Sequence, residues 1–312
     1  MGVRLTSAPD SIVGAAPSPA RQLLRVVRLV RYRFFLYAGL LPYLLGAAWA
    51  YAVEGRFDAP VFWSGFLGVV LAVVGVEAFN EYFDARMGTD RVFNPVDLPP
   101  TSAGVFWVGV AAFAGALAVG VYLTVRGGWP ILAFAILGGA AAIFYEAPPI
   151  RWSYRGLGET VIALSYGPWM VLGSLYLHTG ALSLGAFWAS LVPGLLIMAL
   201  AVVNAIPDFH QDRLVGKRNL VVRLGRERAV WLYLGLAGAS LAVAAAGVVG
   251  GLFPLGCLAA LLSLPLLIRS GRRGFATFEH PRQFVAAIRD IVSCYIVAVG
   301  LFACGVMLWA WK

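Results

Sequence analysis

The chain has 312 residues, of which 61% are hydrophobic and only 12% are charged, and its formal net charge is +9. A soluble domain carries about twice that share of charged residues. Several apolar runs reach the roughly 20 residues that cross a bilayer, so the composition excludes a soluble globular protein and predicts a polytopic membrane protein.

The N-terminal part precedes the first apolar run. Residues 1–20 are rich in Pro, Ala and Ser, and we expect a disordered tail. Arginines then recur at helical spacing among Leu and Val, which predicts an amphipathic helix over 21–33 at the membrane surface. We expect residues 21–312 to form a single transmembrane domain.

Apolar spans separated by polar loops fill the rest of the chain. Their approximate bounds are 34–53, 61–86, 104–124, 129–146, 158–178, 184–207, 228–250, 253–270 and 286–311. We therefore predict an all-α fold of about nine transmembrane helices around a central cavity. The Tyr166-Gly-Pro-Trp169 segment predicts a kink in the fifth span, because proline interrupts helical hydrogen bonding.

Lys and Arg are distributed unevenly over the loops. Of the 24 such residues, only Arg56, Arg126 and Lys312 fall on the side opposite the N-terminus. The side richer in Lys and Arg is cytoplasmic, so we predict an integral protein of the cell membrane with a cytoplasmic N-terminus and an external C-terminus. Topology accounts for most of the positive charge, and we expect no nucleic-acid partner and no obligate protein partner.

The second span ends in the polar run Asn80-Glu81-Tyr-Phe-Asp84, and Asp90 follows in a long, Pro-rich loop. Residues three and four positions apart share one face of a helix. Carboxylates at the end of a membrane-buried helix are costly and seldom without function. Loops of this length are often functional lids.

The sixth span closes with the same pattern. We expect Asp208 and Asp212 to share one helical face, with Asn204 one turn above them, and Lys217 and Arg218 follow. An Asn-x3-Asp pattern at the ends of the second and sixth spans indicates two four-helix units plus one additional helix, as in parallel transporter repeats. All of these polar residues fall on the predicted cytoplasmic side.

These residue types indicate a metal-assisted reaction of a lipid diphosphate. Carboxylate and amide oxygens suit Mg²⁺, which joins proteins to phosphates, and nearby cations complement phosphate oxygens. The predicted metal ligands are Asn80, Asp84, Asp90, Asn204, Asp208 and Asp212, of which Asp84, Asp208 and Asp212 are the predicted catalytic residues. The predicted diphosphate contacts are Arg91, Arg151, Lys217 and Arg218. Tyr145, Tyr154 and Glu81 are assigned to the substrate cavity, where aromatic faces can stabilise a carbocation.

At these residues the sequence resembles the UbiA-type intramembrane prenyltransferase superfamily. Its first motif is matched by Asn80-Glu81-Tyr-Phe-Asp84 with Asp90, and its second by Asp208 and Asp212. The family also has a Gly-Lys-Arg-Thr-Leu-x-Val-Arg-Leu-Gly segment after its second motif. It is similar to the tail Gly216-Lys217-Arg218-Asn219-Leu-Val-Val-Arg223-Leu-Gly225 of this chain. The Gly88-x-Asp90 spacing, the stretch from Tyr166 to Tyr176 and this tail are most similar to the menaquinone-pathway dihydroxynaphthoate polyprenyltransferases.

The resemblance implies that Mg²⁺ ions bridge an isoprenyl diphosphate to the aspartates and that the prenyl group passes to an aromatic ring carbon. Glu81 stands where the family has Asp, and the family's Tyr-x-x-Lys after the fourth span is absent, with Arg151 as a candidate source of that charge. Leu98-Pro99 also departs from the Arg-Pro of other branches.

Other readings remain open at this point. Within the superfamily the acceptor could be a hydroxybenzoate, a tetrapyrrole or a glycerol phosphate lipid, or the protein could be a terpene cyclase without an acceptor. From another class, a cation-coupled transporter would use intramembrane carboxylates, but it predicts charges near the bilayer midplane and inverted repeats. The acidic groups here lie at one predicted membrane face.

Overall fold

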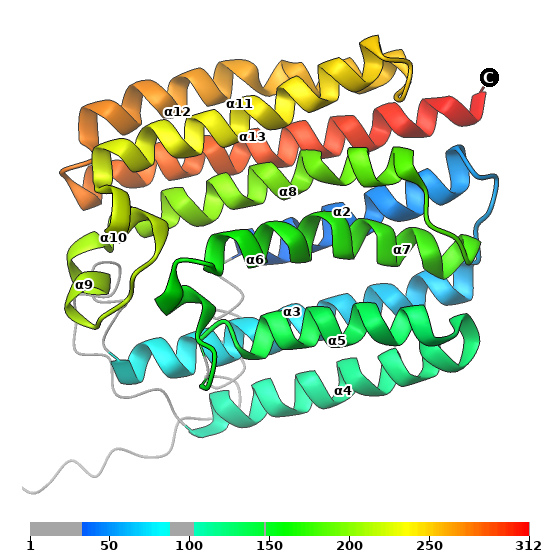
Figure 1. Ribbon diagram of the computed structural model, residues 1–312, viewed down its shortest axis with the longest axis horizontal. Helices are drawn as coiled ribbons and strands as arrows, with labels where there is room; N and C mark the ends of the chain where they lie inside the picture. The colour runs from blue at the N-terminus through cyan, green and yellow to red at the C-terminus, as the bar shows by residue number, and fades with distance from the viewer. Residues whose placement is uncertain (1–32, 88–102, 147, 312) are drawn as a thin grey trace, which may run out of the picture.

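The computed structural model describes residues 33–87, 103–146 and 148–311 (Figure 1). The predicted tail, nearly all of the predicted amphipathic helix and most of the loop after the second span lie outside these residues. The described chain consists of helices and their connections, and it contains no β-strand. The predicted all-α class is confirmed.

Long helices run side by side between the two ends of an elongated bundle (Figure 1). They are α2 (Arg33–Ala52), α3 (Ala59–Met87), α4 (Ala103–Gly127), α5 (Trp129–Ile143), α6 (Gly158–Leu164) continued by η2 (Ser165–Trp169) and α7 (Met170–Thr179), α8 (Leu184–Ala205), α11 (Arg226–Val249), η3 (Leu255–Ser263) continued by α12 (Leu264–Thr277), and α13 (Pro281–Met307) continued by η4 (Leu308–Trp311). Three short helices complete the described part: η1 (Trp152–Arg155), α9 (Phe209–Leu214) and α10 (Leu220–Leu224). Each predicted span coincides with one of the long segments.

Seven helical segments of the described chain are long and apolar enough to cross a membrane, and α5 is a shorter apolar helix of 15 residues. The protein is therefore an integral membrane protein, as predicted. The number of nine spans stays a prediction, because α2 and α5 are not among the seven. The internal duplication and the central cavity also stay predictions.

The predicted kink in the fifth span is a single π-helical turn. η2 contains Pro168 and separates α6 from α7. A Cβ atom added to Gly167 would lie 2.8 Å from the Cα atom of Gly194 on α8. The glycine therefore allows η2 and α8 to pack closely, as small residues do between membrane helices.

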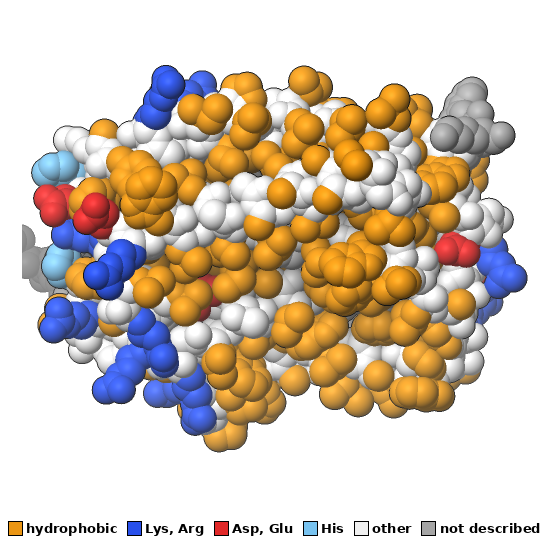
Figure 2. Space-filling view, turned by 45° about the horizontal axis from the view of Figure 1, so that its top comes forward, with side chains coloured by type: hydrophobic (Ala, Val, Ile, Leu, Met, Phe, Trp, Pro, Cys, Tyr) orange, Lys and Arg blue, Asp and Glu red, His pale blue; other side chains and the backbone are white. Residues whose placement is uncertain are grey.

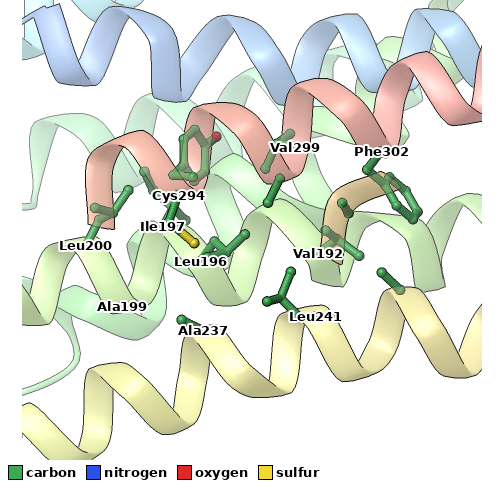
Figure 3. Packing of buried hydrophobic residues seen from close by; sticks show 14 of the residues in the cluster. Val192, Leu196, Ile197, Ala199, Leu200, Ala237, Leu241, Cys294, Val299 and Phe302 are labelled. Carbon is green, nitrogen blue, oxygen red and sulfur yellow. The ribbon is translucent and has the colours of Figure 1, made fainter. Parts of the chain in front are cut away.

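The core is centred on α8, which packs against α11, α6, η2 and α13. Val192, Leu196 and Leu200 of α8 are buried with Leu241 of α11 and Phe302 of α13 (Figure 3). Apolar side chains also cover much of the outside of the bundle (Figure 2), which is the arrangement expected for helices in contact with lipid. The buried core thus fixes α8 rigidly, and α8 leads directly into the second acidic motif.

One end of the bundle collects the segments that carry the predicted motifs. The C-terminal ends of α3, α5, α8 and α12 lie there with α9 and α10, and the chain ends at the opposite end (Figure 1). We call this the motif end. On the face shown in Figure 2, Lys and Arg side chains gather at this end, and the middle is mostly apolar.

Candidate active site

The second acidic motif lies where α8 gives way to α9. Asn204 belongs to the last turn of α8, whereas Asp208 precedes α9 and Asp212 lies within it. The expected continuous helix through all three residues is wrong, because Pro207 has no amide hydrogen and α8 ends before it. The two aspartates keep one-turn spacing, since the Asp212 amide donates to the Asp208 carbonyl at 2.8 Å.

Asp212 is buried and held by two donors from the following loop. Its side chain retains 8% of its accessible surface. Nδ2 of Asn219 donates to Oδ2 of Asp212 at 2.6 Å, and Nζ of Lys217 lies 3.9 Å from Oδ1. The Lys217 amide also donates to the Asp212 carbonyl at 2.9 Å. A buried carboxylate needs such compensation, and these contacts fix the orientation of Asp212.

The ammonium group of Lys217 also binds a carboxylate from a distant loop. Nζ lies 3.2 Å from Oε1 of Glu146, which follows α5, and both side chains are buried. One cation therefore links the α5–η1 connection to the α9–α10 connection. The charge lies among two carboxylates at the motif end, and a ligand anion at Lys217 would compete with Glu146.

Tyr154 brings two predicted diphosphate contacts together. Its ring centroid lies 5.2 Å from Cζ of Arg151 and 5.7 Å from Nζ of Lys217. Arg151 has a positive φ of 53°, a conformation that is uncommon outside glycine, and its side chain is exposed. Cations are attracted to the faces of aromatic rings, so Tyr154 holds both charges close to one ring at the motif end.

A second buried carboxylate supports the loop that carries Lys217. Glu159, in the first turn of α6, is 3% exposed, and its Oε1 accepts a hydrogen bond from the Leu220 amide at 2.9 Å. Arg223 closes the same region, since its guanidinium donates to the carbonyls of Arg218 at 2.8 Å and Arg155 at 2.6 Å. These bonds tie the loop to the η1–α6 connection on both sides. The Arg218 side chain is exposed.

The first acidic motif lies near the C-terminal end of α3, at the same end of the bundle. Asn80 and Glu81 are partly buried there. The backbone of Asp84 belongs to α3, but its side chain, Asp90 and Arg91 lie outside the described residues. The predicted metal and diphosphate roles of these three residues therefore stay predictions.

The helices that carry the two motifs, α3 and α8, do not form an extensive interface in the described part of the chain. α3 packs mainly on α4 and α2, and α8 packs mainly on α11, α6 and η2. α2 and α7 each contact both motif helices. The two motifs thus enter the motif end from different parts of the bundle.

The described residues contain no cluster of three or more His, Cys, Asp or Glu side chains with the proximity of a metal site. Half of the predicted carboxylate ligands, Asp84 and Asp90, have side chains outside the described residues. The remaining predicted ligands, Asn204, Asp208 and Asp212 with Asn80, offer only oxygen donors that suit Mg²⁺. The donor types therefore fit magnesium, and the full ligand set stays a prediction.

Sequence reasoning missed Glu146, Glu159 and Asn219, which hold Lys217, Leu220 and Asp212 in place. Glu146 and Glu159 contact residues that are 71 and 61 positions away in the sequence. Only the Asn219–Asp212 bond is local. Glu146 and Glu159 flank the paired prolines after the fourth predicted span. Their position at the membrane edge could have identified them as candidate site residues. Tyr145, a predicted cavity residue, is partly buried, and its carbonyl accepts from the Ser153 amide at 3.1 Å.

Together these observations define an integral membrane protein with carboxylates and cations gathered at one end of an apolar helical bundle. A family model described as the UbiA prenyltransferase family matches residues 39–288. The chain therefore belongs to the UbiA prenyltransferase family, and the prediction of a prenyltransferase is confirmed at that level. Membership disfavours the transporter reading.

Curated relatives cover most of the chain. The 1,4-dihydroxy-2-naphthoate octaprenyltransferase of Mycobacterium tuberculosis is 31% identical over 78% of this chain and 82% of that protein. The protein of the same name from Bacillus subtilis is 24% identical over 85% of this chain and 88% of its own. A 2-carboxy-1,4-naphthoquinone phytyltransferase of Synechocystis is 24% identical over 98% and 97%.

Two solved structures share the fold. One, described as digeranylgeranylglyceryl phosphate synthase, has a TM-score of 0.62 at 14% identity and covers 92% of this chain and 99% of that one. The other, a UbiA homologue from Archaeoglobus fulgidus bound to DMAPP and Mg²⁺, has a TM-score of 0.55 at 16% identity, with coverage of 89% and 98%. At these identities the likeness establishes the fold alone.

Proposed function

We propose that this protein transfers an isoprenyl group from an isoprenyl diphosphate to a ring carbon of a dihydroxynaphthoate-type aromatic acceptor, with Mg²⁺. In this reaction the bond between the allylic carbon and the diphosphate oxygen breaks, and the ring carbon bonds to the allylic carbon. The diphosphate leaves with the electrons of the broken bond, and the ring regains aromaticity by loss of a proton or, from a carboxylate on that carbon, of CO₂. The observation that carries the donor part is the gathering of Lys217, Arg151 and Asp212 at one end of an apolar bundle.

The cations bind the diphosphate in this proposal. Lys217 is directed toward Asp212 by the loop that Glu159 supports, and Tyr154 lies against both Lys217 and Arg151. Arg218 is exposed beside them, and Arg91 is a further proposed contact. Phosphate oxygens form strong charge-assisted hydrogen bonds with such groups, and the isoprenyl tail would lie among the apolar helices.

Magnesium is the proposed metal, held by Asp208, Asp212 and Asn204 on one side and by Asn80, Asp84 and Asp90 on the other. When bound, it would neutralise charge that develops on the departing diphosphate. Asn219 and Lys217 keep the Asp212 carboxylate oriented. Removing a group that hydrogen-bonds to a metal ligand typically weakens metal binding by about 10- to 100-fold.

Tyr154 was assigned to the substrate cavity, and we propose that it also holds Arg151 and Lys217 in place. Its ring is close to Arg151 and Lys217, so part of its surface already faces positive charge. Tyr145 and Glu81 stay candidates for the substrate cavity. An apolar interior excludes water, and water exclusion protects an allylic carbocation from hydrolysis.

The acceptor assignment rests on the relatives. The names of those from Mycobacterium tuberculosis, Bacillus subtilis and Synechocystis all specify a naphthalene-derived acceptor, although their prenyl groups differ. We propose a naphthoate acceptor for this chain on that ground and leave the length of the prenyl chain open. We also propose that the motif end faces the cytoplasm, because most Lys and Arg residues of the described chain lie there.

Purified protein in lipid nanodiscs tests the proposal. Geranylgeranyl diphosphate and Mg²⁺ are supplied with 1,4-dihydroxy-2-naphthoate, 4-hydroxybenzoate or no acceptor, and products are identified by mass spectrometry. We expect a prenylated naphthalene product from the first mixture alone, and none from the Asp208→Asn variant. Product formation with 4-hydroxybenzoate but not with the naphthoate would overturn the acceptor assignment, and undiminished diphosphate release in Asp208→Asn would overturn the mechanism.

A further inference from the structure

An ion-pair cluster lies on two helices that carry none of the candidate active-site residues. Asp290 of α13 accepts Nη2 of Arg269 at 2.7 Å through Oδ1 and Nη1 of Arg273 at 2.8 Å through Oδ2. The Asp290 side chain is 2% exposed, whereas those of Arg269 and Arg273 are 53% and 46% exposed. One buried carboxylate therefore holds two guanidinium groups whose outer surfaces face the surroundings.

The cluster lies where the apolar part of α12 ends and in the first part of α13. Arg269 directly follows the apolar residues of the candidate membrane span Leu255–Thr277, and Arg273 lies one turn further on. Ser270 fixes the two helices against each other, since its hydroxyl donates to the Ala287 carbonyl at 2.9 Å. A buried carboxylate is costly unless it is paired, and both arginines pair with Asp290.

The cluster carries more positive charge than the pairing requires. Asp290 neutralises one of its two arginines, and Arg272 between them is also exposed. A topology signal needs only the positive charge. It does not need a buried acid that cancels one charge and fixes the position of two guanidinium groups. The two guanidinium groups are therefore held at fixed positions, and the cluster keeps a net positive charge.

Apolar side chains precede the arginines along the same helix. Ile268 is 48% exposed and Leu264, one turn earlier, is 44% exposed. Because they lie toward the membrane interior from Arg269, the helix presents apolar surface followed by cationic surface. A phospholipid has the matching order of acyl chain and phosphate, and basic sites between cytoplasmic ends of transmembrane helices bind such head groups.

We propose that Arg269 and Arg273, held by Asp290, bind the phosphate of an anionic phospholipid whose acyl chain lies along Leu264 and Ile268. Each guanidinium uses one nitrogen for Asp290. The remaining N–H donors of each fork are available to phosphate oxygens. This proposal concerns α12 and α13 and does not depend on the prenyl-transfer reaction.

The test measures lipid binding by delipidated protein. Phosphatidylglycerol is titrated into protein in a neutral detergent, retained lipid is counted by native mass spectrometry, and Tm is recorded in parallel. We expect saturable retention and a rise in Tm for the wild type, with no such effect from phosphatidylcholine. A triple variant, R269Q/R273Q/D290N, is expected to lose both effects without leaving a buried carboxylate unpaired.

R282Q is the matched control, because it changes net charge by the same amount as the triple variant and Arg282 is an exposed residue at the same end. We expect it to bind phosphatidylglycerol as the wild type does. Equal losses in R282Q and the triple variant would overturn the proposal, and so would full retention by a folded triple variant. Inorganic phosphate that reproduces the rise in Tm would show a soluble-anion site and would also overturn it.

Discussion

Lys217 and Glu146 are 71 residues apart in sequence, and their side chains meet at 3.2 Å between Nζ and Oε1. Both are buried at the motif end, and the same ammonium group lies 3.9 Å from Asp212. Lys217 thus has a structural partner in Glu146 and lies beside a proposed metal ligand. Its two roles can be separated by experiment.

Lys217→Met is expected to reduce stability and donor binding together. The change leaves Glu146 and Asp212 without their shared cation, and breaking a buried ion pair costs about 3–5 kcal/mol. Loss of a charged hydrogen bond to the diphosphate, worth about 1.5–3 kcal/mol, should raise KM for geranylgeranyl diphosphate by about tenfold or more. Tm and steady-state kinetics measure the two effects.

The double variant Lys217→Gln/Glu146→Gln separates them. It removes the cation and one of its anions, so Tm should recover relative to Lys217→Met, while KM for the donor stays high. If KM recovers along with Tm, Lys217 supports the fold and does not contact the diphosphate.

Asn219 offers a second separation, because its side chain makes two different hydrogen bonds. Oδ1 accepts from the Val222 amide at 2.8 Å and caps α10, and Nδ2 donates to Asp212 at 2.6 Å. Asn219→Ser should keep a helix cap but lose the bond to Asp212, whereas Asn219→Ala should lose both. Losing a cap costs about 1 kcal/mol.

We therefore expect both Asn219 variants to need more Mg²⁺ for half-maximal activity, with the alanine variant alone showing the additional loss of Tm. A serine variant with the Mg²⁺ requirement of the wild type would contradict the role of Asn219 in orienting Asp212.

Glu159 should tolerate glutamine and not alanine. Its Oε1 accepts from the Leu220 amide, and glutamine retains that acceptor. Alanine leaves a donor without its partner beside a buried site, which costs about 1–3 kcal/mol. We expect Glu159→Ala to lower Tm and kcat, and Glu159→Gln to retain most of both. Equal losses in the two variants would indicate that the charge of Glu159, not its hydrogen bond, matters.

The sequence predicted the membrane architecture well because hydropathy is a local property. The predicted bounds of the second span, 61–86, lie within α3, and the Tyr166-Gly-Pro-Trp169 kink is the π turn η2. The fourth span is shorter than predicted, since α5 ends at Ile143. Proline and glycine affect the backbone conformation of the residues next to them, so the kink could be predicted from the sequence alone.

The contacts within the candidate site were harder to predict from the sequence. Spacing located Asp208, Asp212 and Lys217, but Pro207 divides the expected helix into α8 and α9. Nothing local pairs Lys217 with Glu146, because that contact depends on how two loops meet after the bundle has packed. The same holds for Asp290 with Arg269 and Arg273, which come from two adjacent helices.

A comparison of two glycines tests how closely these loops pack. Gly156 and Gly180 both have positive φ, 72° and 68°. A Cβ atom at Gly156 would lie 2.5 Å from Nε of Arg223 and 2.8 Å from the Arg218 carbonyl, whereas one at Gly180 would meet no atom within 4 Å. Both Gly→Ala variants incur backbone strain of about 1–2 kcal/mol.

Gly156→Ala should in addition displace Arg223 from the loop that carries Lys217. We expect it to lower both Tm and kcat/KM, and Gly180→Ala to lower Tm modestly without changing kcat/KM per folded molecule. Similar kinetics in the two variants would mean that Arg223 does not control the position of the Lys217 loop.

Asp212→Asn tests the proposed metal role against the ion pairs of the same carboxylate. The substitution keeps the shape of the side chain but removes the charge that both Mg²⁺ and Lys217 would use. Removing divalent ions with EDTA should abolish prenyl transfer by the wild type, and added Mg²⁺ should restore it. In Asp212→Asn, we expect little restoration at the Mg²⁺ concentration that saturates the wild type, because carboxylates are the preferred protein ligands of this ion.

Asp58→Asn provides a control, since Asp58 caps α3 through the Val61 amide at the opposite end of the bundle. Full activity of Asp212→Asn, or activity of the EDTA-treated wild type, would exclude Asp212 as a ligand of an essential metal.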